Sequence, residues 1–257
     1  MSLLNWIASP DGYQELQAER ARRHLVEFCT LTMPQYRAGK VHRFMAGKLE
    51  AVERGEIARL MLFLPPRTGK TELLIRWLAW ALGRHPDWPM LYASYGADLA
   101  WDKSRDARSV VESEEYAEVF GARSTVDVPV QTARDSRSVE RWRIRGRRGG
   151  LQAQGVGGPL TGKGGRVIVV DDPVKNREEA DSPTFRRRTW NCWRPLNSNV
   201  EPCMRSTPTQ QGETPSSRIS RAARRAQRLF VLRARPEMLA VPAPFSSPNG
   251  VRRSLTL

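Results

Sequence analysis

The chain has 257 residues, of which 40% are hydrophobic and 27% charged, a composition typical of globular proteins. Its net charge of +15 favours a polyanionic partner, most often nucleic acid, although a basic protein can carry such an excess without one. The cysteines and histidines, three of each and widely scattered, exclude a regularly spaced zinc site and an even disulfide set, which indicates a reduced intracellular setting.

The sequence predicts neither a secretory signal at its N-terminus nor a membrane span. The first residues have no basic region followed by a long apolar core, so no secretory signal is expected. The longest apolar run is too short and interrupted to cross a bilayer. We therefore expect an unsecreted protein with no membrane partner.

Two amphipathic helices are predicted near the N-terminus, over 13–29 and 40–54, because apolar residues recur at helical spacing in both. Gly55 is the expected stop of the second helix. The residues between them, 30–39, read as a loop. Tyr36 and His42 could contact a nucleotide base, or they could only pack or face solvent.

The segment 60–84 predicts a strand, a phosphate-binding loop and a helix in succession. Five apolar residues, 60–64, indicate a strand buried on both faces, and 72–82 is apolar nearly all round, as in a core helix. Gly83 stands where a left-handed helix cap is expected. Between strand and helix lie Pro65-Pro66-Arg67-Thr68-Gly69-Lys70-Thr71.

The residue types in this loop suit a triphosphate. Backbone N–H groups at a helix N-terminus bind phosphate oxygens, Gly69 allows close approach, Lys70 can reach the β- and γ-phosphates, and the Thr71 hydroxyl can bind Mg²⁺. Leu64 replaces the usual first glycine of the pattern, and the prolines have no N–H to donate. Without a second motif, the stretch could also be an ordinary turn between core elements.

A second strand and helix are predicted over 90–95 and 98–118, which repeats the strand–helix order of a parallel α/β sheet. Shorter strands are expected over 126–130 and 139–144. The second of these opens a basic run with an interleaved tryptophan, which could follow a phosphate backbone or could be a solvated strand edge. Its members are Arg141, Trp142, Arg143, Arg145, Arg147 and Arg148.

A glycine-rich loop, 155–165, precedes the strand that completes the predicted nucleotide site. The loop could lie near a ligand or could be a plain connector. The strand 166–170 is β-branched and ends in Asp171 and Asp172. Carboxylates at the carboxyl end of a parallel strand face the ligand crevice, where Asp171 can hold Mg²⁺ beside Thr71 and Asp172 can orient or deprotonate a water. Together the two motifs predict an NTPase site.

These motifs, in this order, resemble the ATPase domain of the phage terminase large subunit, the DNA-packaging motor. The resemblance covers about residues 36–193. It rests on four matching stretches: 65–72, 92–95, 155–164 and 170–176.

The resemblance implies a P-loop fold of the ASCE or RecA-like type, with a mostly parallel sheet flanked by helices. It implies ATP and Mg²⁺ as ligands, with Asp171 on the metal and Arg67 near the γ-phosphate. The expected nucleotide-binding residues are Pro66, Arg67, Thr68, Gly69, Lys70, Thr71 and Glu72; the expected metal ligands are Thr71 and Asp171; and the expected catalytic residues are Lys70, Arg67 and Asp172. Asp172 stands where the family often has glutamate.

The implied partners are double-stranded DNA, a portal protein, a small terminase subunit and further copies of the chain in a ring, in the cytoplasm of a bacterial host. We expect a helical extension over 1–35, an incomplete ATPase domain over 36–193 and a disordered, low-complexity basic tail over 194–257. From residue 191 onward, eleven arginines stand against three glutamates, and only 218–234 has a helical pattern. A truncated or frameshifted reading frame would produce such a tail.

No nuclease centre or nuclease activity is expected, because three acids cannot rebuild a two-metal site. Two alternatives to a packaging motor stay open at this point. One is another nucleic-acid-dependent P-loop ATPase, such as a helicase or recombinase-like motor. The other is a truncated remnant that binds nucleotide or DNA without turnover.

Overall fold

The structure is a computed structural model that describes residues 9–65, 67–122, 129–156, 165–185, 187 and 227–233. Its helices are α2 (Pro10–Arg23), α3 (Leu25–Thr32), α4 (Lys40–Arg54), α5 (Lys70–Arg84), α6 (Ala97–Val111), α7 (Glu114–Val119) and α8 (Arg177–Asp181). Its strands are β1 (Arg59–Leu64), β2 (Pro89–Ser94), β3 (Thr132–Arg137), β4 (Arg141–Ile144), β5 (Gly150–Gly155), β6 (Val167–Asp171) and β7 (Gln227–Arg233).

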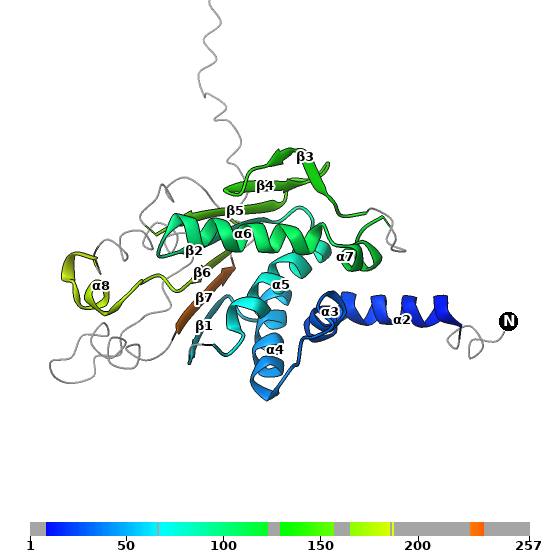
Figure 1. The fold of residues 1–257 in the computed structure, drawn as a ribbon, viewed down its shortest axis with the longest axis horizontal. Helices are drawn as coiled ribbons and strands as arrows, with labels where there is room; N and C mark the ends of the chain where they lie inside the picture. The colour runs from blue at the N-terminus through cyan, green and yellow to red at the C-terminus, as the bar shows by residue number, and fades with distance from the viewer. Residues whose placement is uncertain are drawn as a thin grey trace, which may run out of the picture.

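The strands form one mixed sheet in the order β1-β7-β6-β2-β5-β4-β3. At its centre β2 pairs in parallel with β5 and β6. Strand β7 is antiparallel to both β1 and β6, so β1 and β6 run in the same direction. Figure 1 shows α6 lying across β2 and β5, with α5 beside it and α4 packed against α5. This arrangement confirms the predicted α/β class.

The core is built around α5, as its apolar sequence predicts. Its residues from Leu73 to Leu82 are buried, and it packs against α3, α4 and α6. Two tryptophans fix their neighbours by hydrogen bonds: the indole N–H of Trp77 donates to the Leu49 carbonyl (3.1 Å), and that of Trp80 donates to the Ala21 carbonyl (2.9 Å). The helix therefore holds α4 and α2 in place while its first turn reaches the carboxyl end of β6.

The predicted cap at Gly83 is wrong, because α5 runs through it to Arg84. Its backbone is not left-handed, and the reason for a glycine here is space. A Cβ atom on Gly83 would lie 2.4 Å from the ring of Phe120. The glycine lets the loop after α7 close on the end of α5.

Strand β1 is only half-buried, which corrects the prediction of a strand covered on both faces. Leu60 and Leu62 are buried, whereas Met61 and Phe63 are 42% and 43% exposed. Successive side chains of a strand point to opposite faces of the sheet, so the alternation shows that one face of β1 is covered and the other is open. An apolar run alone therefore did not reveal how many layers cover this strand.

Two helices predicted as continuous are each divided in two. The first breaks at His24, whose backbone is extended and whose neighbour Leu25 donates its N–H to the Glu50 carboxylate (2.7 Å). The second breaks at Ser113, whose hydroxyl accepts a hydrogen bond from the Tyr116 N–H (3.1 Å) and starts α7.

Among the described residues, no helix is both long and apolar enough to cross a membrane.

Helix α4 matches its prediction over 40–54, and Gly55 ends it in the left-handed conformation with a φ of 86°. Strands β3 and β5 were not predicted. Of the strand predicted over 126–130, residues 126–128 lie outside the described residues and the remainder forms no strand. Residues 157–164 of the glycine-rich loop also lie outside the described part of the chain.

Strand β7 corrects the prediction made for 218–234. Residues 227–233 form a strand between β1 and β6, where a helical pattern was expected. The rest of the segment 194–257 lies outside the described residues. Backbone hydrogen bonds to two neighbouring strands can select a strand even where side-chain periodicity favours a helix.

Candidate functional site

The loop from β1 to α5 has two residues in the left-handed conformation, Arg67 (φ 61°) and Gly69 (φ 72°). The Thr68 hydroxyl closes the turn by donating to the Pro65 carbonyl (3.0 Å). A Cβ atom on Gly69 would lie 2.7 Å from His42 Nε2. Glycine is therefore favoured at this position by its backbone conformation and by the close approach of the histidine ring. Pro66, predicted to contact nucleotide, lies outside the described residues.

The N-terminus of α5 is an anion-binding arrangement. Its first intrahelical bond runs from the Leu73 N–H to the Gly69 carbonyl (3.1 Å), and Gly69 provides no side-chain cap. The N–H groups that precede this bond face the end of the helix with the positive pole of its dipole. Glu72, also predicted to contact nucleotide, pairs with Arg76 (2.9 Å).

The helix N-terminus meets the carboxyl end of β6 through Lys70. Its Nζ atom lies 2.7 Å from Asp171 Oδ1 and 3.1 Å from Asp172 Oδ1. The Thr71 hydroxyl donates to Asp171 Oδ2 (2.9 Å). The side chains of Lys70 and Asp171 are only 1% and 5% exposed, and that of Asp172 is 24% exposed. The structure thus brings together four predicted site residues from the two ends of a hundred-residue stretch.

The contacts of the two carboxylates with Lys70 differ in kind. Asp172 accepts a hydrogen bond from the ammonium group. Asp171 Oδ1 is buried and accepts no well-aligned hydrogen bond from any described residue, although it is the nearer oxygen, so its contact with Lys70 is an ion pair. Asp171 Oδ1 therefore retains capacity for another ligand.

Tyr92 is a site residue whose role sequence reasoning missed. Its hydroxyl donates to Asp171 Oδ2 (3.2 Å) from strand β2, next to β6 in the sheet. Burial, followed by the negative charge of Asp171, raises the pKa of Tyr92 well above its usual value. The parallel register, with Tyr92 opposite Val169, could have indicated this contact only once the pairing of β2 with β6 was known.

Asp172 has an unusual backbone conformation for its residue type. Its φ is 45°, in the left-handed region, and its carbonyl accepts a hydrogen bond from the Tyr95 N–H (3.1 Å). Such a conformation costs about 1 kcal/mol or more and is retained where surrounding contacts fix it. The bond ties the ends of β2 and β6 together and holds the Asp172 carboxylate beside Lys70.

Tyr36 and His42 form a packed pair beside the loop. Their rings meet edge to face at 5.6 Å, and His42 Nδ1 accepts a hydrogen bond from the Gly39 N–H (3.1 Å). Tyr36 is buried, and burial raises its pKa. The packing interpretation of Tyr36 therefore agrees with the structure, while His42 lies against Gly69.

The donor set fits a hard divalent cation and a polyphosphate. A buried carboxylate and a neighbouring hydroxyl, from Asp171 and Thr71, are oxygen ligands of the kind that Mg²⁺ prefers. The described residues contain no cluster of three or more acidic, histidine or cysteine side chains able to hold a metal without other ligands. Mg²⁺ usually keeps several waters and shares phosphate oxygens, so two protein ligands suffice.

Comparison of the chain with protein-family models, with characterised proteins and with solved structures gave no significant match. The resemblance to terminases therefore rests on the motifs in the sequence.

Proposed function

We propose that the chain is an ATPase that acts on DNA, of the kind found in the packaging motors of the phage terminase large subunit. The single observation that carries this proposal is the convergence of Lys70, Thr71 and Asp171 at the N-terminus of a buried helix. The same three residue types, on a loop–helix and on the end of another strand of the sheet, define the nucleotide site of P-loop enzymes.

In this proposal the N-terminus of α5 and Lys70 bind the β- and γ-phosphates of ATP. Thr71 and Asp171 hold Mg²⁺, which neutralises phosphate charge when bound. Tyr92 fixes the orientation of the Asp171 carboxylate through its hydrogen bond. The proposed fold is the P-loop fold, with which the mixed α/β sheet is compatible.

Asp172 is the proposed base that accepts a proton from the attacking water, because it is the more exposed of the two carboxylates and its backbone is fixed by Tyr95. Arg67 is exposed and makes no ion pair with a described residue, so it is free to approach the γ-phosphate. These two roles rest on position and chemistry.

Double-stranded DNA is the proposed partner, supported by the net charge of +15. A portal protein, a small terminase subunit and a ring of copies are proposed from the resemblance alone. The proposed location is the cytoplasm of a bacterial host, and no nuclease activity is expected.

Phosphate release from Mg-ATP by the purified full chain tests the proposal. Lys70→Ala and Asp172→Asn should each abolish release, with folding checked by tryptophan fluorescence. Lys103→Ala is the matched control, because Lys103 pairs with Asp106 (2.8 Å) on the surface of α6, and its turnover should equal that of the wild type. DNA binding without turnover in the wild type would refute the ATPase, and separation of forked DNA strands would favour a helicase over a packaging motor.

A further inference from the structure

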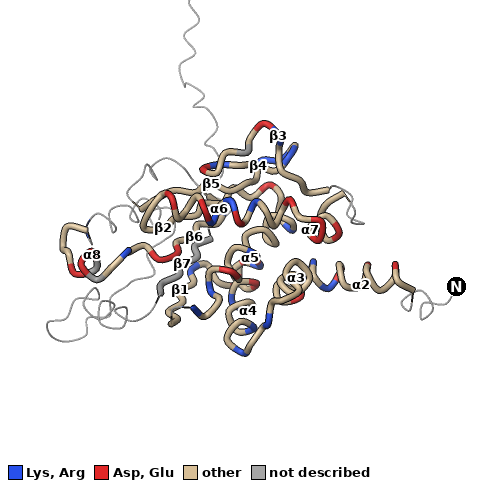
Figure 2. The backbone as a smooth tube through the Cα atoms, in the orientation of Figure 1, with Lys and Arg blue, Asp and Glu red and all other residues tan. Residues whose placement is uncertain are grey.

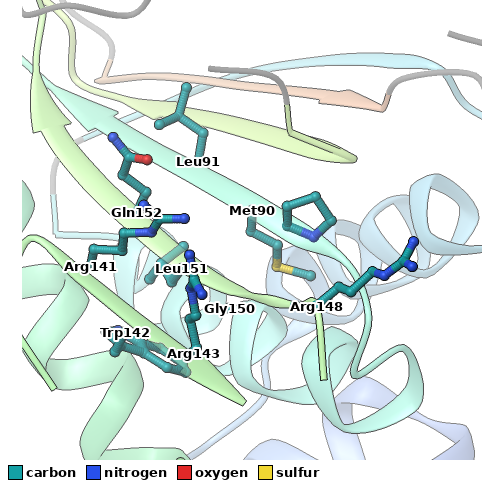
Figure 3. Close-up of a pocket in the computed structure, with 11 residues that line it drawn as sticks. Met90, Leu91, Arg141, Trp142, Arg143, Arg148, Gly150, Leu151 and Gln152 are labelled. Atoms are coloured by element: carbon teal, nitrogen blue, oxygen red, sulfur yellow. The ribbon is translucent and has the colours of Figure 1, made fainter. Parts of the chain in front are cut away.

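A groove of about 310 Å³ lies where β4 and β5 pass the start of β2, away from the proposed nucleotide site (Figure 3). Its walls include three arginines of the basic run, and its floor is made by strand residues. The lining includes Pro89 and Met90 of β2, Arg141 and Arg143 of β4, and Arg148 of the turn that follows β4. We call it the arginine groove.

Strand β4 divides its side chains between the two faces of the sheet. Trp142 is buried, and its indole N–H donates to Ser104 Oγ of α6 (3.1 Å). Arg141 and Arg143 are exposed on the opposite face. They pair in register with Gln152 and Gly150 of β5, so both guanidinium groups extend from the strand that borders the groove.

The turn that carries Arg148 is fixed to the start of β2. The Arg148 N–H donates to Asp87 Oδ1 (3.0 Å), and the same carboxylate pairs with Arg147 (3.5 Å). In the view of Figure 3, Arg148 lies on the other side of Met90 from Arg141. The groove is therefore bordered by arginines on two sides.

The three lining arginines are uncompensated. Arg141, Arg143 and Arg148 are exposed, and none makes a salt bridge with a carboxylate of the described residues. Figure 2 shows Lys and Arg segments along β4, beside β3. A border of unpaired guanidinium groups around an open groove attracts anions from solution and can donate paired hydrogen bonds to phosphate oxygens.

We propose that the arginine groove binds the phosphate backbone of double-stranded DNA. Alternate residues of a strand, such as Arg141 and Arg143, repeat at about 6.8 Å, which matches the rise of two nucleotides along the DNA helix axis at about 3.4 Å each. Guanidinium groups fixed on a strand suit a repeating row of phosphates better than one small anion. The groove lies where β2, β5 and β4 run side by side, and the exposed Arg141 and Arg143 place its border in solvent, where a long partner can reach it.

This inference rests on the proposed function and deepens it, because it assigns the DNA partner to a defined surface. Strand β2 joins the two sites: Pro89 lines the arginine groove, and Tyr92 contacts Asp171 in the nucleotide site. DNA bound at one end of this strand thus lies on the same rigid element as the carboxylate proposed to hold Mg²⁺.

The test measures binding of a fluorescent random-sequence duplex to the full chain across a salt series. The variant Arg141→Gln/Arg143→Gln is compared with Arg20→Gln/Arg105→Gln, which removes two charges from side chains that are each 52% exposed and lie on α2 and α6. The groove variant should bind about 10- to 100-fold more weakly, and the slope of log affinity against log salt should fall by about 2. The control should keep the wild-type slope.

Equal affinity and slope in the two double variants would overturn the inference, because the effect would then be one of total charge. Binding to poly-glutamate, a polyanion without phosphates, is measured on the same variants. If Arg141→Gln/Arg143→Gln lost binding to poly-glutamate but kept its binding to DNA, the inference would also be overturned. Phosphate release in the absence of DNA is measured on the same preparations. A wild type without turnover whose DNA binding depends on Arg141 and Arg143 would refute the ATPase but support the groove.

Discussion

Replacement of Lys70 by methionine should destabilise the fold strongly, although the new side chain has a similar length. The ammonium group lies 2.7 Å and 3.1 Å from two carboxylates. With an effective dielectric constant of about 20, each contact contributes roughly 5 to 6 kcal/mol of attraction, much of which is offset by the desolvation of the charges. Removal of one member of a buried pair costs about 3–5 kcal/mol, because the other charge stays buried without its partner.

Urea unfolding followed by tryptophan fluorescence measures this loss. The matched control is Lys103→Met, whose ammonium group pairs with Asp106 at the surface, and its cost should be below about 1 kcal/mol. The double variant Lys70→Met/Asp171→Asn should recover most of the stability, because the buried negative charge is also removed. A Lys70→Met variant as stable as Lys103→Met would refute the argument that Lys70 neutralises Asp171 in the folded protein.

Three further predictions concern single residues. Gly83→Ala should lower the free energy of unfolding by about 1–3 kcal/mol, since the added methyl meets the Phe120 ring at 2.4 Å, and a thermal melt unchanged from wild type would contradict this. The free energy of unfolding should fall as pH rises above about 10, because the raised pKa of Tyr92 keeps its hydroxyl protonated in the folded state while the unfolded state loses that proton. In urea titrations at several pH values, Tyr92→Phe should reduce the dependence of the unfolding free energy on pH. Burial raises the pKa of the Cys29 thiol to about 12. At a pH equal to the ordinary thiol pKa of 9.0, iodoacetamide should therefore leave Cys29 unmodified in the native protein and modify it in urea, as measured by peptide mass spectrometry.

Local sequence patterns predicted those parts of the fold that one element determines by itself. The helix over 40–54 has a clear amphipathic period and a glycine stop, and the structure reproduces both. Helix α5 was identified by its apolar character, and its burial follows. The proximity of Lys70 and Asp171 was predicted from the order of two motifs, and the structure confirms it at 2.7 Å.

The features that were missed depend on neighbours distant in the sequence. Strand β5, Gly150–Gly155, contains two glycines and two glutamines and has no strong strand propensity, yet it pairs with β2 along its whole length. Gly83 resembled a helix cap until Phe120 was placed against it. Tyr92 acquires its role only from the adjacency of β2 and β6. Sequence periodicity contains no information on such pairings.

The double contact of Lys70 has a consequence for the proposed nucleotide site. In the structure, one ammonium group balances two carboxylates, of which that of Asp171 is almost fully buried. A triphosphate at the N-terminus of α5 would draw Lys70 toward its own charge, and Asp171 and Asp172 would then repel each other without a counter-charge. A divalent cation beside Asp171 would restore that balance. Under the proposed function, ATP and Mg²⁺ therefore bind as a pair, because each removes the electrostatic cost that the other would create alone.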